Sequence, residues 1–77
     1  MIDENGDIVM ENVESSNIAQ KGYNPETKVF RVLFHNGGVF EYDGVPEDIA
    51  LGIDTASSVG GYFHSMIRSV FPARRIR

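Results

Sequence analysis

The sequence contains neither cysteine nor tryptophan. The absence of cysteine excludes disulfide bonds, a thiolate nucleophile and every zinc site built from thiolates. It also fits a reducing compartment, so we expect a cytoplasmic protein. No hydrophobic run approaches the ~20 residues that a membrane-spanning helix needs, and Met1–Glu4 lacks the basic start of a signal peptide. We therefore expect no role at a membrane.

Basic residues are also scarce, since 7 Lys and Arg face 11 Asp and Glu and the formal net charge is −4. Nucleic-acid-binding domains usually carry a basic excess, so this balance argues against binding of long duplexes. The charge is uneven, however. Residues 1–14 contain acidic but no basic side chains, and residues 68–77 contain arginine but no acidic residue. A basic end on an acidic body can hold a small anion, and the alternative is that both ends are merely solvated.

The length of 77 residues allows a single hydrophobic core. Apolar residues make up 42% of the chain and charged residues 23%, which is typical of a folded domain. Three segments have the alternating pattern of β-strands, and they are residues 18–23, 28–35 and 39–42. Residues 7–12 are a weaker candidate for an edge strand.

The loop at residues 36–38 decides which side chains of the second and third strands face each other. A three-residue loop with glycine in the left-handed conformation would pair Phe34 with Phe40 and Val32 with Tyr42. We prefer this register to a two-residue loop because it gathers the aromatic side chains on one face. A three-stranded meander needs one such buried face.

Two helices are predicted in the second half of the chain. Val45–Asp48 combines proline with acidic residues, as helix starts often do. Ser57–Ser58 offers an N-cap for a second helix that begins near Val59 and ends at Pro72. The predicted fold class is therefore α+β, a three-stranded antiparallel β-meander packed by two C-terminal α-helices.

An ordered series of short motifs runs through most of the chain: Ser16–Ile18, Gly22–Tyr23, Phe30-x-Val32-x-Phe34, Asn36–Gly37, Phe40–Asp43, Val45–Pro46, Ala56-x-Ser58-x-Gly60-x-Tyr62–Phe63 and Ile67–Arg68. This series resembles the KTSC domain, named after a segment at the C-terminus of some lysyl-tRNA synthetases. The resemblance implies a domain at residues 15–71, preceded by an acidic extension at 1–14 and followed by an Arg-rich tail at 72–77.

The resemblance implies the same order of strands and helices and no established activity, with RNA binding suggested by the synthetase context alone. This chain departs from the family pattern at two positions. Phe40 replaces the first tyrosine of a Tyr-x-Tyr motif, so one hydroxyl is lost. Lys21 replaces a residue that is usually apolar, so we expect the first strand to be more exposed there.

No catalytic, metal or cofactor site is predicted. Ser57, Ser58, His64 and Asp54 lack the strained turn of a nucleophile elbow, and Ser58 is better explained as a helix cap. The 2 histidines have no ligand spacing. The acidic residues near the first helix are explained by a turn and a helix start.

The candidate ligand-binding residues are Tyr42, Ser58, Gly60, Gly61, Tyr62, His64, Arg68, Arg74 and Arg75. Serine and glycine at a helix start leave backbone N–H groups free for a phosphate. The tyrosines, histidine and arginines supply stacking and charge-assisted hydrogen bonds. Each has a structural alternative: Ser58 as a cap, the tyrosines as core residues, and Arg68 as a partner of Glu41 or Asp43.

These residues favour a non-enzymatic module that binds RNA or a small nucleotide. A phage protein that sequesters a cyclic oligonucleotide is one form of this hypothesis, with a homo-oligomer building the enclosed site that one short chain cannot. The alternative is a protein–protein interaction module with no nucleic-acid role. It would use a sheet edge or a patch that includes the exposed Leu51.

Overall fold

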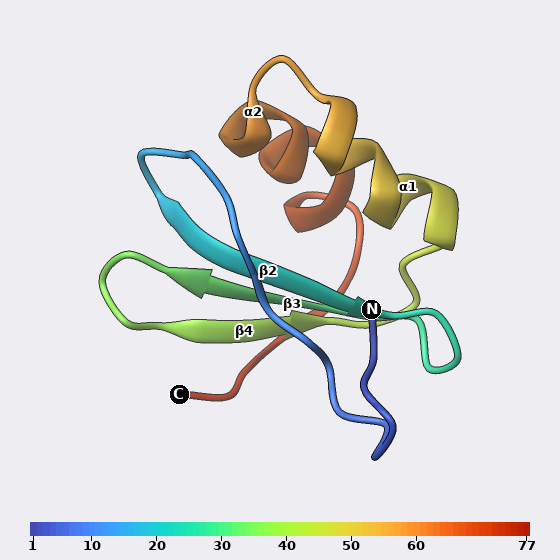
Figure 1. Ribbon diagram of the computed structural model, residues 1–77. Coiled ribbons are helices and arrows are strands. Elements are labelled where there is room, and N and C mark those ends of the chain that lie inside the picture. The colour runs from blue at the N-terminus through green and yellow to red at the C-terminus, as the bar shows by residue number, and fades with distance from the viewer.

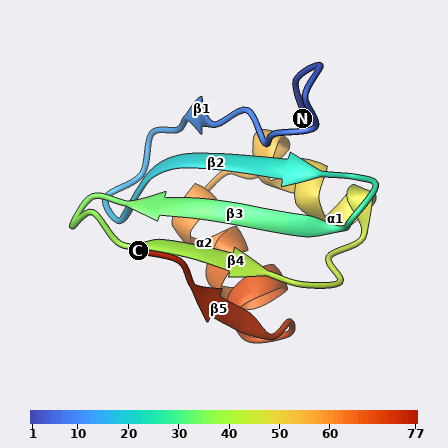
Figure 2. The same cartoon turned by 90° about the horizontal axis from the view of Figure 1, so that it is seen from below.

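The computed structural model describes residues 1–77, and an antiparallel sheet forms one of its two layers (Figure 1). The sheet has five strands that neighbour one another in chain order (Figure 2). They are β1 (Glu11–Asn12), β2 (Ile18–Asn24), β3 (Val29–Phe34), β4 (Val39–Tyr42) and β5 (Ala73–Arg75). The expectation of three strands is therefore corrected to five, with β1 and β5 added at the two edges.

The helices form the second layer and cover one face of the sheet (Figure 1). Helix α1 (Glu47–Gly52) continues into the 3₁₀ turn η1 (Ile53–Thr55), and α2 (Val59–Phe63) continues into the π-helical turn η2 (His64–Arg68). The α+β class and the two C-terminal helices are as predicted. None of these helices is long and apolar enough to cross a membrane.

Both helix starts follow from local sequence. Pro46 is the N-cap of α1, and Glu47 and Asp48 occupy its first turn, where acidic side chains complement the helix dipole. Ser58 is the N-cap of α2, and its hydroxyl oxygen accepts a hydrogen bond from the Gly61 N–H at 3.1 Å. The predicted cap at Ser58 is therefore confirmed.

The β3–β4 register differs from the predicted one by two residues. Phe30 pairs with Tyr42 and Val32 pairs with Phe40, so Phe34 does not pair with Phe40. The Phe34 N–H instead donates to the Gly38 carbonyl at 2.9 Å, across a loop in which Gly37 has a φ of 93°. A shift of two keeps every side chain on its face, so the aromatic residues still share one face.

The core lies between the sheet and the helices. Phe63 of α2 packs against three rings of the sheet, with centroid distances of 6.4 Å to Phe30, 5.9 Å to Phe34 and 5.3 Å to Tyr42. The buried hydrophobic cluster consists of Ile18, Tyr23, Phe30, Val32, Tyr42, Val45, Ala50, Ile53, Phe63 and Ile67. Burial of these rings holds the end of the second helix over β3 and β4.

The N-terminal segment crosses the outer face of the sheet at Gly22. A Cβ atom there would meet a methyl group of Ile8 and would lie 2.9 Å from the Val9 carbonyl oxygen and from the Met10 sulfur. Only glycine fits such a close approach. The N-terminal segment is therefore held on β2 by this contact as well as by the two-residue pairing of β1 with β2.

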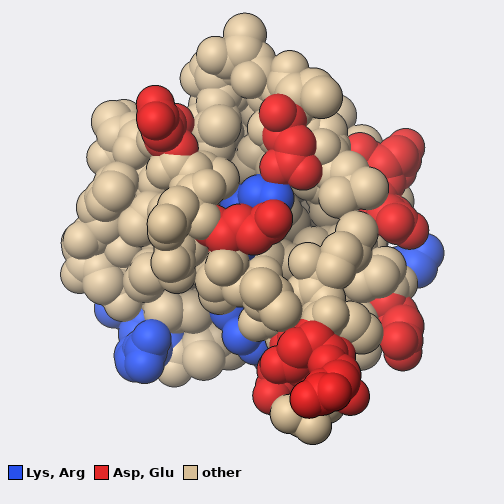
Figure 3. Space-filling view, in the orientation of Figure 1, with Lys and Arg blue, Asp and Glu red and all other residues tan.

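Lys21 is buried, with 6% of its surface exposed, which corrects the expectation of an exposed strand end. Its ammonium group lies 2.7 Å from a carboxylate oxygen of Glu11 in β1 and 2.7 Å from one of Asp54 in η1. Burial alone would lower the pKa of Lys21, but the hydrogen bonds and charges of Asp54 and Glu11 outweigh it, so the pKa is raised. On the face drawn in Figure 3, acidic groups surround a recessed basic one.

The first prediction concerns this buried ammonium group. The double substitution Glu11→Gln, Asp54→Asn leaves Lys21 buried without a counter-charge, and we expect it to lower the free energy of unfolding by about 2–3 kcal/mol. This is less than the ~3–5 kcal/mol typical of breaking a fully buried pair, because both carboxylates are half-exposed. Lys21→Met removes the charge itself and costs less. Urea unfolding at neutral pH measures both changes.

The pH dependence provides the control. The pKa of Lys21 is higher in the folded than in the unfolded protein, so its stabilisation is complete below the unfolded value of ~10.4 and is lost as the pH rises through the folded value. The parent protein should therefore lose more stability at alkaline pH than Lys21→Met. Equal losses would contradict the role of the pair.

Candidate ligand-binding cleft

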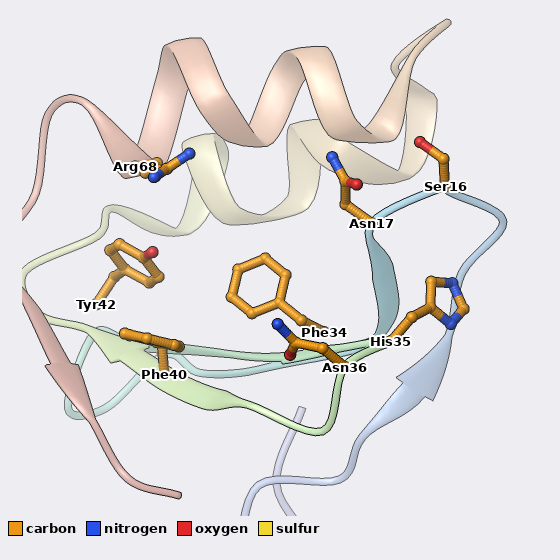
Figure 4. A pocket seen from close by; sticks show the side chains of 8 residues that line it. All are labelled: Ser16, Asn17, Phe34, His35, Asn36, Phe40, Tyr42 and Arg68. Carbon is orange, nitrogen blue, oxygen red and sulfur yellow. The ribbon is translucent and has the colours of Figure 1, made fainter.

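A cleft opens between the β3–β4 hairpin and the end of the second helix (Figure 4). Its volume is about 530 Å³, within the usual range for small-molecule sites. The residues that line it are Ser16, Asn17, Phe34, His35, Asn36, Phe40, Tyr42 and Arg68. Aromatic rings form its floor, and polar groups stand around its rim.

Phe34 and Phe40 supply the floor. Both side chains are only half-buried, and their rings meet edge to face with centroids 5.7 Å apart. The Arg75 guanidinium lies over the Phe40 ring, 5.6 Å from its centroid. This cation–π contact orients the Phe40 ring and places a positive charge beside the cleft.

Tyr42 and Arg68 present polar groups that have no protein partner. Tyr42 is 3% exposed, its hydroxyl makes no hydrogen bond, and no fully buried side-chain atom lacks a partner, so the hydroxyl must reach the cleft. Arg68 is exposed, forms no ion pair and lies above Tyr42 in the view of Figure 4, at the helix side of the cleft. Burial raises the pKa of Tyr42, and the Arg68 charge opposes that rise. A donor pair of this kind suits an anion.

The rim at the other end is held by backbone contacts. The His35 ring nitrogen Nε2 lies 2.9 Å from the Ser15 carbonyl oxygen, and the His35 N–H donates to the Asn17 carbonyl at 2.9 Å. These two bonds fix the loop that carries Ser16 and Asn17. The side-chain amide of Asn17 has no protein partner and faces the cleft in Figure 4.

Arg74 has a structural role. It forms two hydrogen bonds with the Asp43 carboxylate, at 3.0 and 2.8 Å, and an ion pair with Glu41 at 3.0 Å. The hydrogen bond from Arg74 lowers the pKa of Asp43. Arg31 pairs with Glu41 at 2.7 Å. The acids considered as partners for Arg68 are therefore paired with other arginines.

The remaining predicted residues do not line the cleft. Ser58, Gly60 and Gly61 line a second hollow, which adjoins the cleft at Ser16 and Asn17 and contains Glu14, whose negative charge disfavours a phosphate. The Ser58 hydroxyl is already engaged as a cap. His64 is exposed and lines no hollow of the structure.

Tyr62 also lies outside the cleft, and its surroundings match the structural alternative. Its hydroxyl donates to the Ile49 carbonyl at 2.6 Å, and its ring packs over Gly52. Of the nine candidate residues, the structure brings only Tyr42 and Arg68 into one cleft. Sequence reasoning missed Phe34, Phe40 and Asn36, because it assigned the two rings to the core and the asparagine to a turn. No group of acidic and histidine side chains is placed to hold a metal ion.

Comparison with known proteins places the fold in a family. A family model described as the KTSC domain matches residues 14–71. The crystal structure of a KTSC domain protein from Yersinia pestis has a TM-score of 0.86 and 31% identity, covering 91% of this chain and 99% of that one. An uncharacterised protein of Stutzerimonas stutzeri is 29% identical over 56 residues, which are 73% of this chain and 79% of that protein.

Lysine–tRNA ligases also match over this region. The ligase of Nostoc sp. is 36% identical over 58 residues, which are 75% of this chain but 10% of the ligase. The ligase of Nostoc punctiforme is 34% identical over the same length. The chain therefore spans about a tenth of the ligases that it matches.

The second prediction separates the two tyrosines. Tyr62→Phe leaves the Ile49 carbonyl without its donor and should lower the free energy of unfolding by about 1 kcal/mol. Tyr42→Phe removes a hydroxyl that has no protein partner, so its unfolding free energy should stay within about 0.5 kcal/mol of the parent value. Urea unfolding compares the two. A larger loss for Tyr42→Phe would show that this hydroxyl serves the fold.

Proposed function

The chain belongs to the KTSC domain family, and we propose that it is a non-enzymatic module that binds a nucleotide in the cleft beneath Arg68. The observation that carries the proposal is the pair of unpartnered groups on Tyr42 and Arg68, which face one aromatic cleft. Buried polar side chains usually have a partner in the protein, and the hydroxyl of the buried Tyr42 has none. A pair without one has the chemistry of a ligand site.

The phosphate of the nucleotide would lie at the Arg68 end. A guanidinium donates several hydrogen bonds in one plane and suits phosphate geometry. The Tyr42 hydroxyl would add a further donor. Glu41 alternates with Tyr42 along β4 and pairs with Arg31 and Arg74 on the outer face of the sheet, so no carboxylate lines the cleft beside Arg68. The site is therefore positive within a chain of net charge −4.

The base would lie over Phe34 and Phe40. Stacking of a base on an aromatic side chain contributes ~1–3 kcal/mol and tolerates any sequence. The amide groups of Asn17 and Asn36 stand beside these rings and can bond the edge of a base (Figure 4). The aromatic floor and the polar rim of the cleft together fit one nucleotide, with its base over the rings and its phosphate at Arg68.

Both an RNA single strand and a small free nucleotide present this unit. The acidic body disfavours long duplexes, whose binding needs many phosphate contacts. The match to a region of lysine–tRNA ligases supports an RNA ligand. Sequestration of a cyclic oligonucleotide by a phage protein is the other form, and it would require a second copy of the chain to close the open cleft.

The lack of an activated nucleophile supports a binding role rather than catalysis. Ser16 is the only hydroxyl-bearing residue of the cleft apart from Tyr42, and the neighbouring His35 ring bonds to a backbone carbonyl instead. A hydrolase would need that histidine as a base toward the serine. We therefore place no catalytic residue in the cleft.

A second groove supports the alternative of a protein-interaction module. It lies on the outer face of the sheet, has a volume of about 360 Å³, and is lined by Met10, Gln20, Arg31, Leu33, Val39, Ile76 and Arg77. Leu51 is exposed but lines a different hollow, so it does not extend this apolar surface. A protein partner would bind here with little dependence on salt.

The third prediction compares two arginines. Arg68→Gln should weaken the binding of uridine 5′-monophosphate and of a short single-stranded oligouridylate at least tenfold, because a charge-assisted hydrogen bond is lost. Arg77→Gln changes the net charge equally but lies outside the cleft, so it should change the affinity less than about twofold. NMR titration of the backbone amides reports both the affinity and the location.

Several outcomes separate the forms of this proposal. Binding of the oligouridylate but not of a cyclic dinucleotide would support the RNA form, and the reverse with a larger particle in sedimentation would support sequestration. Equal affinity of both arginine variants would contradict the site. Absence of any shift in cleft residues with every nucleotide would favour the protein-interaction module.

A further inference from the structure

Asn36 presents only hydrogen-bond donors to the cleft. Its side-chain oxygen accepts a hydrogen bond from the Gly38 N–H at 2.9 Å, so this oxygen lies on the loop side of the amide. Figure 4 shows the amide nitrogen directed toward the Phe34 ring, inside the cleft. Because the oxygen is turned to the loop by this bond, the two N–H groups are what the amide offers to a ligand in the cleft.

The loop itself maintains this orientation. Gly37 has a φ of 93°, its N–H donates to the Phe34 carbonyl at 2.9 Å, and the Phe34 N–H donates to Gly38. These bonds hold the Gly38 N–H against the asparagine oxygen. A rotated amide would place its own N–H groups against that donor and lose the bond. The donor face of Asn36 is therefore built into the hairpin.

The other polar groups of the cleft do not set such a preference for the base. Arg68 and Tyr42 stand at the phosphate end, and the His35 ring lies beyond Asn36, on the far side from Arg68 (Figure 4). Asn17 has no bond that fixes its amide, so it can turn either its oxygen or its nitrogen toward a base. Asn36 alone is held in one orientation.

From this geometry, and resting on the proposed function, we infer that the cleft prefers keto bases, uracil and guanine, over amino bases, cytosine and adenine, and that Asn36 is the residue that discriminates between them. Uracil and guanine carry a carbonyl oxygen where cytosine and adenine carry an amino group. The donors of Asn36 bond a carbonyl. If the base carries an amino group at this position, its N–H groups face those of Asn36. Both donors then lose a hydrogen bond to water and gain none in return.

The fourth prediction compares two nucleotides whose pyrimidine bases differ in the group at C4 and in the proton on N3. Uridine 5′-monophosphate should bind the parent protein about tenfold more tightly than cytidine 5′-monophosphate, the ratio expected for one well-placed hydrogen bond. Calorimetry or NMR titration gives the two dissociation constants. Guanosine and adenosine 5′-monophosphates repeat the comparison for purines. This ratio is measured on the unmodified protein, so it does not depend on the folding of any variant.

A pair of matched variants assigns the preference to a residue. Asn36→Asp keeps an oxygen for Gly38 but turns an acceptor toward the cleft, so the uridine preference should disappear or reverse. Asn12→Asp introduces the same charge in β1, outside the cleft, keeps the oxygen to which Gln20 donates, and should leave the ratio within about twofold of the parent ratio. The new negative charge repels the phosphate of both nucleotides equally, so this repulsion cancels in the ratio of the two dissociation constants.

The failures of the two proposals are distinguishable. Equal binding of uridine and cytidine nucleotides would overturn the base preference while the nucleotide site stands. A ratio that stays unchanged in Asn36→Asp, or that changes equally in Asn12→Asp, would overturn the assignment to Asn36. If no nucleotide binds the parent protein at all, the proposed function fails and the preference fails with it.

Discussion

The packing of Phe63 determines where the second helix ends, and the cleft depends on that position. The ring of Phe63 lies among three rings of β3 and β4. One turn later Ile67 is fully buried. With both residues directed into the core, the next residue, Arg68, must emerge at the boundary of the helix and the sheet, above Tyr42. The same aromatic cluster that stabilises the domain thus positions the only arginine of the cleft.

The short edge strand β5 completes this arrangement electrostatically. It brings Arg74 beside Glu41 and Asp43, and Arg31 supports Glu41 from β3. Glu41 alternates with Tyr42 along β4, so its carboxylate and its two arginine partners lie on the outer face of the sheet, away from Arg68. The alternation of the strand therefore keeps acidic groups out of the cleft, and a charge count of the whole chain does not reveal it.

Sequence patterns predicted what local chemistry decides and failed where distant segments meet. The cap at Ser58, the helix start at Pro46 and the shared face of the aromatic residues follow from neighbours in the chain. Strand β5 lacks any alternation over its three residues, so only its pairing with β4 reveals it. Lys21 seemed exposed because its partners lie far from it in the sequence. Tyr42 and Arg68 were chosen as candidates for their chemistry, and both line the cleft, whereas no sequence pattern tells which aromatic ring remains half-buried.

An open cleft on so small a domain restricts how it can be selective. One chain of 77 residues cannot surround a nucleotide, so a base bound as we propose would keep one side in water, and stacking alone would contribute little discrimination. Selectivity must then come from rim groups that hold a fixed orientation, and the glycine-rich hairpin supplies one in Asn36. Affinity must come from elsewhere. Linkage to a larger RNA-binding protein or association of several copies raises the effective concentration of such a site without changing its contacts. A small module that occurs both alone and as a tenth of a longer ligase is suited to either use.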